Sequence, residues 1–218
     1  MALRLFLDSA DPQAWRSWLP TGLFHGITTN PTLLRRAGQP CRLDRLTDLA
    51  GEALQLGARE LHLQAWGDDL AACGRCLAAI APGRIWVKLP ISRAGAAAAQ
   101  ALMAEGIPVT FTACYEPSQV LLAVALGADY IAPYLGRITD QGRDGPAELI
   151  RMQRCIEGLG SPLRLLVASL RQPDELAALA AEGLDTFTFS PAIAEALFTV
   201  EATTAAALQF EQDAAATL

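Results

Sequence analysis

Short stretches of β-branched and aromatic residues recur along the whole chain, and each is followed by a polar turn. Within several of these stretches apolar and polar residues alternate, as in Leu61-His62-Leu63-Gln64, which is the period of a β-strand. The pattern predicts eight strands, at residues 3–8, 26–30, 60–64, 84–89, 107–112, 129–134, 163–168 and 186–190.

Segments rich in Ala and Leu separate these strands, and many of them open with Asp, Ser or Pro and close at Gly, as helix capping favours. They predict helices at residues 11–18, 44–56, 68–80, 92–104, 116–126, 144–158, 173–181 and 191–198, with an extra C-terminal helix at 201–215. Strict alternation of strand and helix implies right-handed crossovers and a parallel sheet. Eight such units predict an α/β fold, a (β/α)8 TIM barrel, formed by one domain over residues 1–218.

An open, doubly wound sheet is the alternative architecture. That fold places a glycine-rich phosphate-binding turn after its first strand. The corresponding residues 7–11 read LDSAD and contain no glycine. The barrel is therefore preferred.

The alternation within the strands predicts which side chains share the barrel interior. If Asp8 points inward, so do Arg4 and Phe6, while Leu3, Leu5 and Leu7 face the helices. Five polar residues with the inward phase then fall at the C-terminal ends of their strands, namely Asp8, Gln64, Lys88, Thr112 and Tyr134. TIM-barrel active sites are built at that end.

The opposite end of the barrel is predicted to be structural. Arg4, Glu60 and Arg84 would meet there as a stabilising ion network. We interpret His62 as a hydrogen-bonded interior residue and His25 as a loop residue.

Sixteen of the seventeen basic residues are arginine, and the one lysine is Lys88, inside the apolar stretch IWVKLP. A codon bias towards arginine explains the sixteen but leaves the lysine unexplained. Arginine keeps its charge under protein conditions, whereas a desolvated lysine amine can lose its proton and become a nucleophile. Lys88 is therefore the first catalytic candidate. Asn30 is similarly the only asparagine of the chain.

A neutral lysine amine attacks a ketone to give a carbinolamine and then a Schiff base, with no need for a metal or cofactor. Gln64, Thr112 and Tyr134 can hold the water that such proton transfers require. Asp8 can bind or deprotonate a substrate hydroxyl, although a carboxylate there can also cap the turn that follows it. The candidate phosphate ligands are Arg137, which follows the sixth strand, and Ser169 and Arg171, which follow the seventh.

The composition argues against nucleic-acid binding, membrane insertion, secretion and a disulfide framework. A net charge of −6 gives no positive field for nucleic acid. No stretch has the length of a membrane span, and the first ten residues lack the apolar core of a secretory signal, so we expect a cytoplasmic protein. Five cysteines make a disulfide framework improbable, and the pair Cys73 and Cys76 lies within a predicted helix without further ligands at metal spacing.

Several stretches together resemble the short-form transaldolase family, and within it most closely the fructose-6-phosphate aldolases. They read FLDSAD at residues 6–11, GITTNPT at 26–32, VKLP at 87–90, EGIP at 105–108, APY with GRI at 132–138, and AS at 168–169. The resemblance implies a (β/α)8 barrel with Lys88 as the Schiff-base residue. It also implies that Asp8, Thr28, Asn30 and Ser169 line the dihydroxyacetone and phosphate sites, and that the chain forms a ring, a pentamer or decamer, in which the C-terminal helix packs on a neighbour.

Two positions separate subgroups of this family. Members that transfer the three-carbon unit usually carry Glu at the end of the third strand and Phe in the sixth-strand motif, whereas the aldolases carry Gln and Tyr, as Gln64 and Tyr134 do here. Phe111, Gly136 and Arg171 depart from the aldolase pattern.

The leading expectation is a lyase that reversibly splits fructose 6-phosphate into dihydroxyacetone and glyceraldehyde 3-phosphate. The alternative is a transaldolase that passes dihydroxyacetone between sugar phosphates in the pentose phosphate pathway. A non-catalytic sugar-phosphate-binding barrel and a sugar-phosphate isomerase with a carboxylate base are weaker alternatives.

Overall fold

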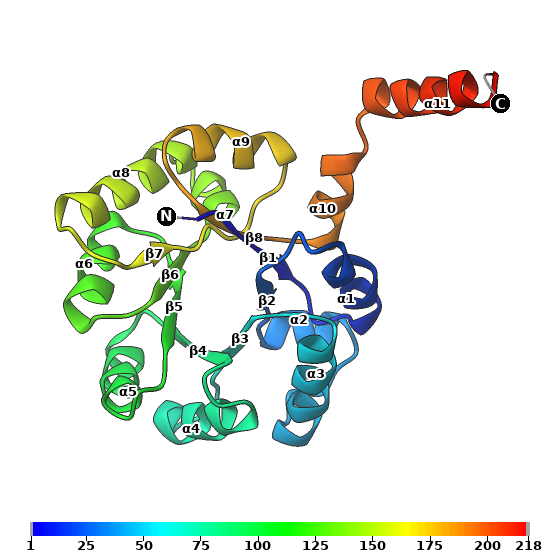
Figure 1. The fold of residues 1–218 in the computed structure, drawn as a ribbon. Helices are drawn as coiled ribbons and strands as arrows, with labels where there is room; N and C mark the ends of the chain where they lie inside the picture. The colour runs from blue at the N-terminus through cyan, green and yellow to red at the C-terminus, as the bar shows by residue number, and fades with distance from the viewer. Residues whose placement is uncertain (1, 217–218) are drawn as a thin grey trace.

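The computed structural model describes residues 2–216, and its strands form a ring of parallel strands surrounded by helices (Figure 1). The strands are β1 (Arg4–Asp8), β2 (Gly26–Thr28), β3 (Glu60–Gln64), β4 (Ile85–Pro90), β5 (Val109–Cys114), β6 (Tyr130–Pro133), β7 (Arg164–Leu165) and β8 (Thr186–Phe189). Each predicted strand is present, and the expected (β/α)8 TIM barrel is confirmed.

Neighbouring strands pair in parallel in the order β7-β6-β5-β4-β3-β2-β1-β8. The last junction, between β7 and β8, is made through Val167, whose N–H donates to the carbonyl of Thr186 at 2.9 Å and whose carbonyl accepts from the N–H of Thr188 at 2.8 Å. An isolated parallel bridge joins Val167 to Phe187. These contacts close the ring.

The helices that cover the barrel begin and end close to their predicted bounds. They are α1 (Pro12–Trp18), α3 (Leu43–Gln55), α4 (Leu70–Ile80), α5 (Arg93–Ala104), α6 (Pro117–Leu126), α8 (Gly145–Gly158), α9 (Pro173–Ala181) and α10 (Pro191–Phe198). Side-chain caps explain many of their starts. The Asp11 carboxylate accepts from the N–H of Gln13, and the Ser92 hydroxyl accepts from the N–H of Gly95.

Three short elements were not predicted. They are the 3₁₀ turn η1 (Leu19–Thr21) and the six-residue helices α2 (Pro31–Arg36) and α7 (Leu135–Asp140). Fewer than two helical turns are too short to show a periodic apolar pattern. As a result, Asn30 and Tyr134, expected as the last residues of strands, are instead the N-caps of α2 and α7.

The predicted phase of side chains along the strands is confirmed. Phe6, Tyr130, Ala132, Leu166 and Ala168 form a separate apolar cluster, the barrel interior. Leu7 belongs instead to the larger cluster between the strands and the helices. Leu3 is an exception, because it precedes β1 and is 61% exposed instead of facing the helices.

The N-terminal end of the barrel holds the predicted ion network, with Arg4 and Glu60 but without Arg84. The Arg4 guanidinium lies 2.8 Å from the Glu60 carboxylate, which also contacts His25 at 2.8 Å and accepts from the Tyr130 hydroxyl at 2.7 Å. Arg84 does not join them, because its guanidinium donates to the carbonyls of residues 58 and 59. The prediction that Arg84 joins this network is therefore wrong, because backbone carbonyls of the neighbouring loop accept its hydrogen bonds.

His62 and His25 lie where the sequence suggested. His62 is buried in the interior, where its Nδ1 lies 2.8 Å from the Thr110 hydroxyl. His25 lies in the loop before β2.

The C-terminal helix α11 (Glu201–Ala216) extends away from the barrel and has no buried residue (Figure 1). Its large apolar side chains are Leu208, 60% exposed, and Phe210, 70% exposed. The predicted extra helix is confirmed, and it has one residue more than expected.

Candidate active site

A pocket of about 220 Å³ opens at the C-terminal end of the barrel. The residues that line it come from the ends of six strands and from the short segments that follow them. They are Asp8, Asn30, Thr32, Leu33, Arg36, Lys88, Ala132, Tyr134, Arg137, Leu166, Ala168, Ser169, Thr188 and Ser190. Six of the predicted site residues are in this lining, namely Asp8, Lys88, Asn30, Tyr134, Arg137 and Ser169.

Lys88 lies on β4 and is only 4% exposed. Its Nζ donates a hydrogen bond to the carbonyl oxygen of Thr29 at 3.1 Å. Burial lowers the pKa of the amine, while the nearby Asp8 carboxylate acts in the opposite direction. A lowered pKa increases the fraction of neutral amine, which is the nucleophilic form.

Asp8, at the end of β1, accepts a hydrogen bond from the Thr28 hydroxyl, which also contacts the Thr188 hydroxyl. The Thr28 hydroxyl lies 2.6 Å from the Asp8 Oδ1 and 2.5 Å from the Thr188 hydroxyl. Because a hydroxyl has one proton, Thr28 donates to the carboxylate and Thr188 donates to Thr28. Burial raises the pKa of Asp8, against the effects of Lys88 and of Thr28. The carboxyl group is thus suited to accept a proton and to release it again.

Thr112 and Tyr134 come together at the ends of β5 and β6, with their hydroxyl oxygens 2.8 Å apart. The register of β5 against β6 shifts between Phe111 and Cys114, and Ala113 within this bulge has φ = 57°. Thr112, although buried, is not part of the pocket lining.

Gln64 is the register partner of Lys88 on the neighbouring strand. Its side chain is half-buried and makes no hydrogen bond to another residue in the described part of the chain. It lies outside the pocket lining, as does Thr28, whose hydroxyl reaches the pocket only through Asp8 and Thr188.

Asn30 holds the start of α2 and also faces the pocket. Its Oδ1 accepts from the N–H of Leu33 at 3.0 Å. The side-chain NH₂ group, which has two donors, is then available to a ligand.

Arg137, on α7, is positioned by two tyrosines. Its Cζ lies 4.8 Å from the centroid of the Tyr134 ring, and its Nη1 donates to the Tyr115 hydroxyl at 3.4 Å. These contacts keep the guanidinium at the pocket while most of its donors stay free for an anion.

Ser169 has φ = 61°, in the left-handed region that is uncommon for residues other than glycine. Its carbonyl accepts from the N–H of Gly136 at 3.0 Å. A Cβ at position 136 would lie 2.6 Å from that carbonyl oxygen and 2.7 Å from the Arg171 Nε. Only glycine therefore allows α7 to approach the segment after β7 this closely.

Arg171 is placed differently from the other predicted ligands. Its guanidinium pairs with the Asp140 carboxylate, and the residue is exposed and absent from the pocket lining. Binding of a substrate phosphate by Arg171 would require this ion pair to open.

Sequence reasoning missed part of the polar lining, above all Thr32, Arg36, Thr188 and Ser190. Thr188 and Ser190 are two positions apart, so the alternation of side chains along β8 could have predicted that both face the pocket. Thr32 and Arg36 lie on α2, which was not predicted, and no periodic pattern indicates it.

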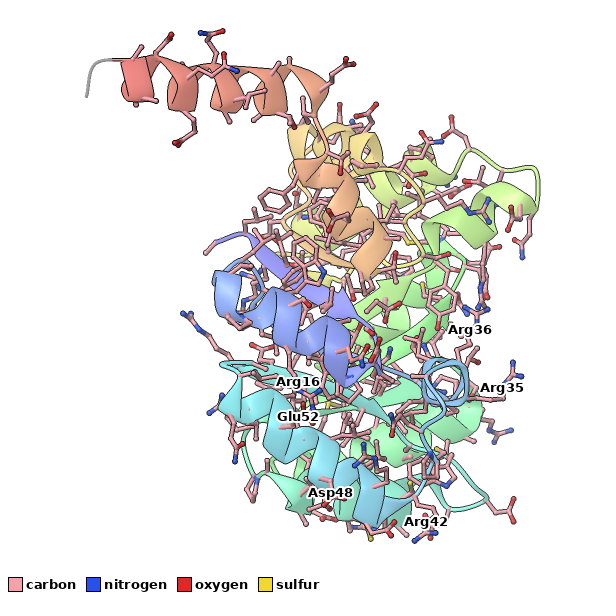
Figure 2. All side chains as sticks on the ribbon, turned by 90° about the vertical axis from the view of Figure 1, so that its right-hand side faces the viewer. Arg16, Arg35, Arg36, Arg42, Asp48 and Glu52 are labelled. Atoms are coloured by element: carbon pink, nitrogen blue, oxygen red, sulfur yellow. The ribbon has the colours of Figure 1, made fainter. Side chains whose placement is uncertain are left out.

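A second, larger hollow of about 710 Å³ lies between α1 and α3, where Arg16 and Glu52 form an ion pair at 2.6 Å (Figure 2). It is an open surface depression without a nucleophile. Within residues 2–216 we find neither a cluster of side chains suited to a metal ion nor a helix long and apolar enough to cross a membrane.

The pocket thus combines an amine of lowered pKa, a carboxyl group of raised pKa and the guanidinium groups of Arg36 and Arg137. This set is suited to addition of the amine to a carbonyl group in a molecule that carries an anion. A hydroxyl pair completes it at the edge of the pocket.

Comparison with known proteins agrees with this chemistry. The model of the family described as Transaldolase/Fructose-6-phosphate aldolase matches residues 5–218. A "Probable transaldolase" of Caulobacter sp. is 37% identical over 99% of this chain and 98% of its own length. A protein of the same description from Caulobacter vibrioides is 35% identical, with the same coverage.

Among solved structures, a thiamine phosphate pyrophosphorylase from Pyrococcus furiosus matches with a TM-score of 0.62. The match covers 89% of this chain and 91% of that protein, at 14% identity. At this identity the likeness supports the barrel fold alone.

Proposed function

Because the chain belongs to the transaldolase/fructose-6-phosphate aldolase family, we propose that Lys88 forms a Schiff base with a ketose phosphate and carries its three-carbon unit to an aldose phosphate. The observation that carries this proposal is the position of the only lysine. It is buried in β4, opens onto the pocket and interacts with the Asp8 carboxylate.

In the proposed reaction the neutral Lys88 amine adds to the substrate ketone. Loss of water then gives the protonated Schiff base, which withdraws electrons from the adjacent carbon–carbon bond. Asp8 takes the proton of the hydroxyl next to that bond, the bond breaks, and an aldehyde leaves. The three-carbon unit stays on Lys88 as an enamine.

Two outcomes are open to the enamine. It can attack an aldehyde acceptor, which is transfer, or its carbon can be protonated and the imine hydrolysed by water, which is net cleavage. A water held by the Thr112 and Tyr134 hydroxyls, with Gln64 alongside, would serve the second route.

The phosphate of the substrate is proposed to bind Arg137 and Ser169, with Arg171 as a further ligand if it leaves Asp140. Asn30 and Thr28 are proposed to serve the dihydroxyacetone unit, Asn30 by direct donation and Thr28 by holding Asp8.

The descriptions of the relatives favour transfer over cleavage, since the matching proteins are named probable transaldolases. The leading expectation from the sequence, cleavage of fructose 6-phosphate, is not confirmed by them. Gln64 and the Tyr134 hydroxyl keep cleavage as the second candidate, because a phenol beside the water assists hydrolysis where a phenyl ring would not.

A coupled assay distinguishes these reactions. Fructose 6-phosphate is supplied alone or together with erythrose 4-phosphate, and glyceraldehyde 3-phosphate is measured. We expect turnover to depend on the acceptor. Equal rates with and without it would show an aldolase, and no product under either condition would leave only a non-catalytic barrel. Activity should survive treatment with EDTA, because the proposed steps use only side chains.

We also propose that the chain forms a homo-oligomer, a pentamer or decamer, and works in the cytoplasm within the pentose phosphate pathway. Support for assembly comes from α11, which buries none of its residues and exposes the apolar side chains of Leu208 and Phe210.

A further inference from the structure

Two threonine hydroxyls meet in the barrel interior, one from each neighbour of the strand that carries Asp8. That strand, β1, lies between β2 and β8 in the ring (Figure 1). In the strand registers Thr28 on β2 is the partner of Asp8, and Thr188 on β8 is the partner of Phe6. The hydroxyl oxygens of Thr28 and Thr188 lie 2.5 Å apart, so the two side chains meet across β1.

The two carboxylate oxygens of Asp8 differ in their contacts. Oδ1 accepts a hydrogen bond from the Thr28 hydroxyl at 2.6 Å. Within residues 2–216 the structure gives Oδ2 no hydrogen bond, although Asp8 lines the pocket. One oxygen is therefore held by the protein, while the other is available to a hydroxyl group of the substrate.

The hydroxyl that holds Asp8 depends in turn on Thr188. Thr28 has one hydroxyl proton, which it gives to Asp8, and it accepts the proton of Thr188. Thr28 is fully buried, so water cannot supply a donor in place of Thr188. Each hydrogen bond in such a chain strengthens the next, and a buried acceptor without its donor is costly.

No other group near Asp8 fixes its orientation in the same way. Lys88 acts on Asp8 by charge, which has little directional preference, and its Nζ donates instead to the Thr29 carbonyl. Neither β2 nor β8 carries an ionisable side chain. The orientation of the carboxylate therefore depends on the two threonines.

From this arrangement we propose that Thr188 is a positioning residue for the proposed reaction: it holds the Thr28 hydroxyl, which holds Oδ1 of Asp8 and leaves Oδ2 facing the substrate. The substrate hydroxyl gives its proton to Oδ2, and its O–H electron pair forms the carbonyl of the leaving aldehyde. The electron pair of the broken carbon–carbon bond passes to the enamine on Lys88. Thr188 takes no part in bond making. The inference rests on the proposed function and adds the residue that orients its base.

The test separates the step that needs Asp8 from the step that does not. Release of glyceraldehyde 3-phosphate from fructose 6-phosphate, measured in a single turnover with the protein in excess, requires Asp8 to accept a proton. Trapping of dihydroxyacetone on Lys88 with sodium cyanoborohydride breaks no carbon–carbon bond. We expect Thr188→Val to slow release by about two- to tenfold, the effect of one neutral hydrogen bond, and to leave trapping unchanged.

Two further variants test the hydroxyl itself. Thr188→Ser restores the donor and should restore the rate of release. Thr186→Val is the matched control, because Thr186 is fully buried on the same strand but its hydroxyl contacts Arg164 and Asp185. It should release glyceraldehyde 3-phosphate at the unmodified rate. If Thr188→Val does not fold, Thr188→Ala is measured in its place with the same expectation.

A double variant tests whether Thr188 acts through Thr28. Thr28→Val should slow release by about ten- to a hundredfold, since it removes a hydrogen bond to a charged group. Adding Thr188→Val to that variant should have no further effect.

The inference is overturned if Thr188→Val leaves release unchanged, or if it slows trapping as much as release. It is also overturned if Thr188→Ser does not restore the rate, if Thr186→Val reproduces the loss, or if the effect of Thr188→Val persists in full without the Thr28 hydroxyl. Absence of any adduct on Lys88 in the unmodified protein would overturn the proposed function itself, and this inference with it.

Discussion

The hydroxyl oxygens of Thr112 and Tyr134 lie 2.8 Å apart, although Thr112 is buried on β5 and Tyr134 lines the pocket directly after β6. The bulge around Ala113 lies immediately after Thr112. A water that contacts this pair would have a donor and an acceptor within reach, which is the requirement for proton transfer at the Schiff base.

Tyr134→Phe should depress net cleavage of fructose 6-phosphate more than transfer to erythrose 4-phosphate. The phenyl ring keeps the contact with Arg137 but leaves the Thr112 hydroxyl without its partner. We expect a several-fold rise in the ratio of transfer to cleavage, measured in the coupled assay. Adding Gln64→Glu should raise the ratio further, and an unchanged ratio in both variants would remove the pair from the hydrolysis step.

Lys88→Arg should abolish activity and the borohydride adduct together. The guanidinium keeps the positive charge but cannot form an imine. Apart from the N-terminal amine, no other primary amine competes in this chain. An intact adduct in the variant, located by mass spectrometry, would contradict the proposed nucleophile.

Arg137→Ala should lower kcat/KM for phosphorylated substrates. The loss of transition-state stabilisation should be about 1.5–3 kcal/mol, the range for hydrogen bonds to charged groups. Unphosphorylated donors should be spared. Arg171→Ala serves as the comparison. A smaller loss there would mean that the ion pair with Asp140 stays closed, and an equal loss would mean that it opens to bind phosphate.

Gly136→Ala should destabilise the protein by about 1–3 kcal/mol, as overpacking does, because the new Cβ meets the Ser169 carbonyl. Gly51→Ala is the matched control. Gly51 lies within α3 with no atom within 4 Å of its added Cβ, so alanine there should stabilise by about 0.5–1 kcal/mol. Chemical denaturation measures both, and equal effects would contradict the close approach.

The free energy of unfolding should fall between pH 6.5 and about pH 4. Burial lowers the pKa of His62 to about 4, from an ordinary value of 6.5. In this range the unfolded chain binds a proton that the folded chain does not, so stability decreases as the pH falls. The full loss is on the order of 3 kcal/mol.

His62→Phe should flatten this dependence, because a phenyl ring fits the aromatic surroundings of Phe6 and Tyr130 and does not titrate. Denaturation at a series of pH values is the measurement. A second decrease, below pH 4.5, should be smaller in the variant than in the unmodified protein. Burial acts to raise the pKa of Glu60, but its contacts with His62, Tyr130 and His25 outweigh this and lower it to about 2, and the variant loses the His62 contact, the largest of the three. An unaltered slope above pH 4.5 in the variant would contradict the role of His62.

The barrel and much of its mouth could be predicted because they depend on regular patterns. The two-residue alternation correctly placed Asp8 and Lys88 at the pocket from two strands, and Tyr134 from the position directly after a third. The absence of lysine from the rest of the chain singled out Lys88 as a candidate, and the structure places this residue in the pocket lining.

The features that the sequence did not predict are short helices and contacts between residues far apart in the chain. The helices that present Arg36 and Arg137 have six residues each, too few for a periodic pattern. The partner of Arg171 is 31 residues away in the chain, and the carbonyls that hold Arg84 belong to a different loop. Neither pairing follows from local sequence, since exposed arginines have many competing acceptors.

The burial of Lys88 leaves the surface of the folded chain without a lysine side chain, since that residue is 4% exposed and has no other of its kind. Amine-reactive dyes and crosslinkers should therefore label this protein at its N-terminus and scarcely elsewhere while it stays folded. A lysine-specific endoprotease has a single peptide bond to cut, after position 88 and before Leu89 in the middle of β4. Cleavage there would report directly on opening of the barrel at β4, and a ligand that occupies the pocket should slow it.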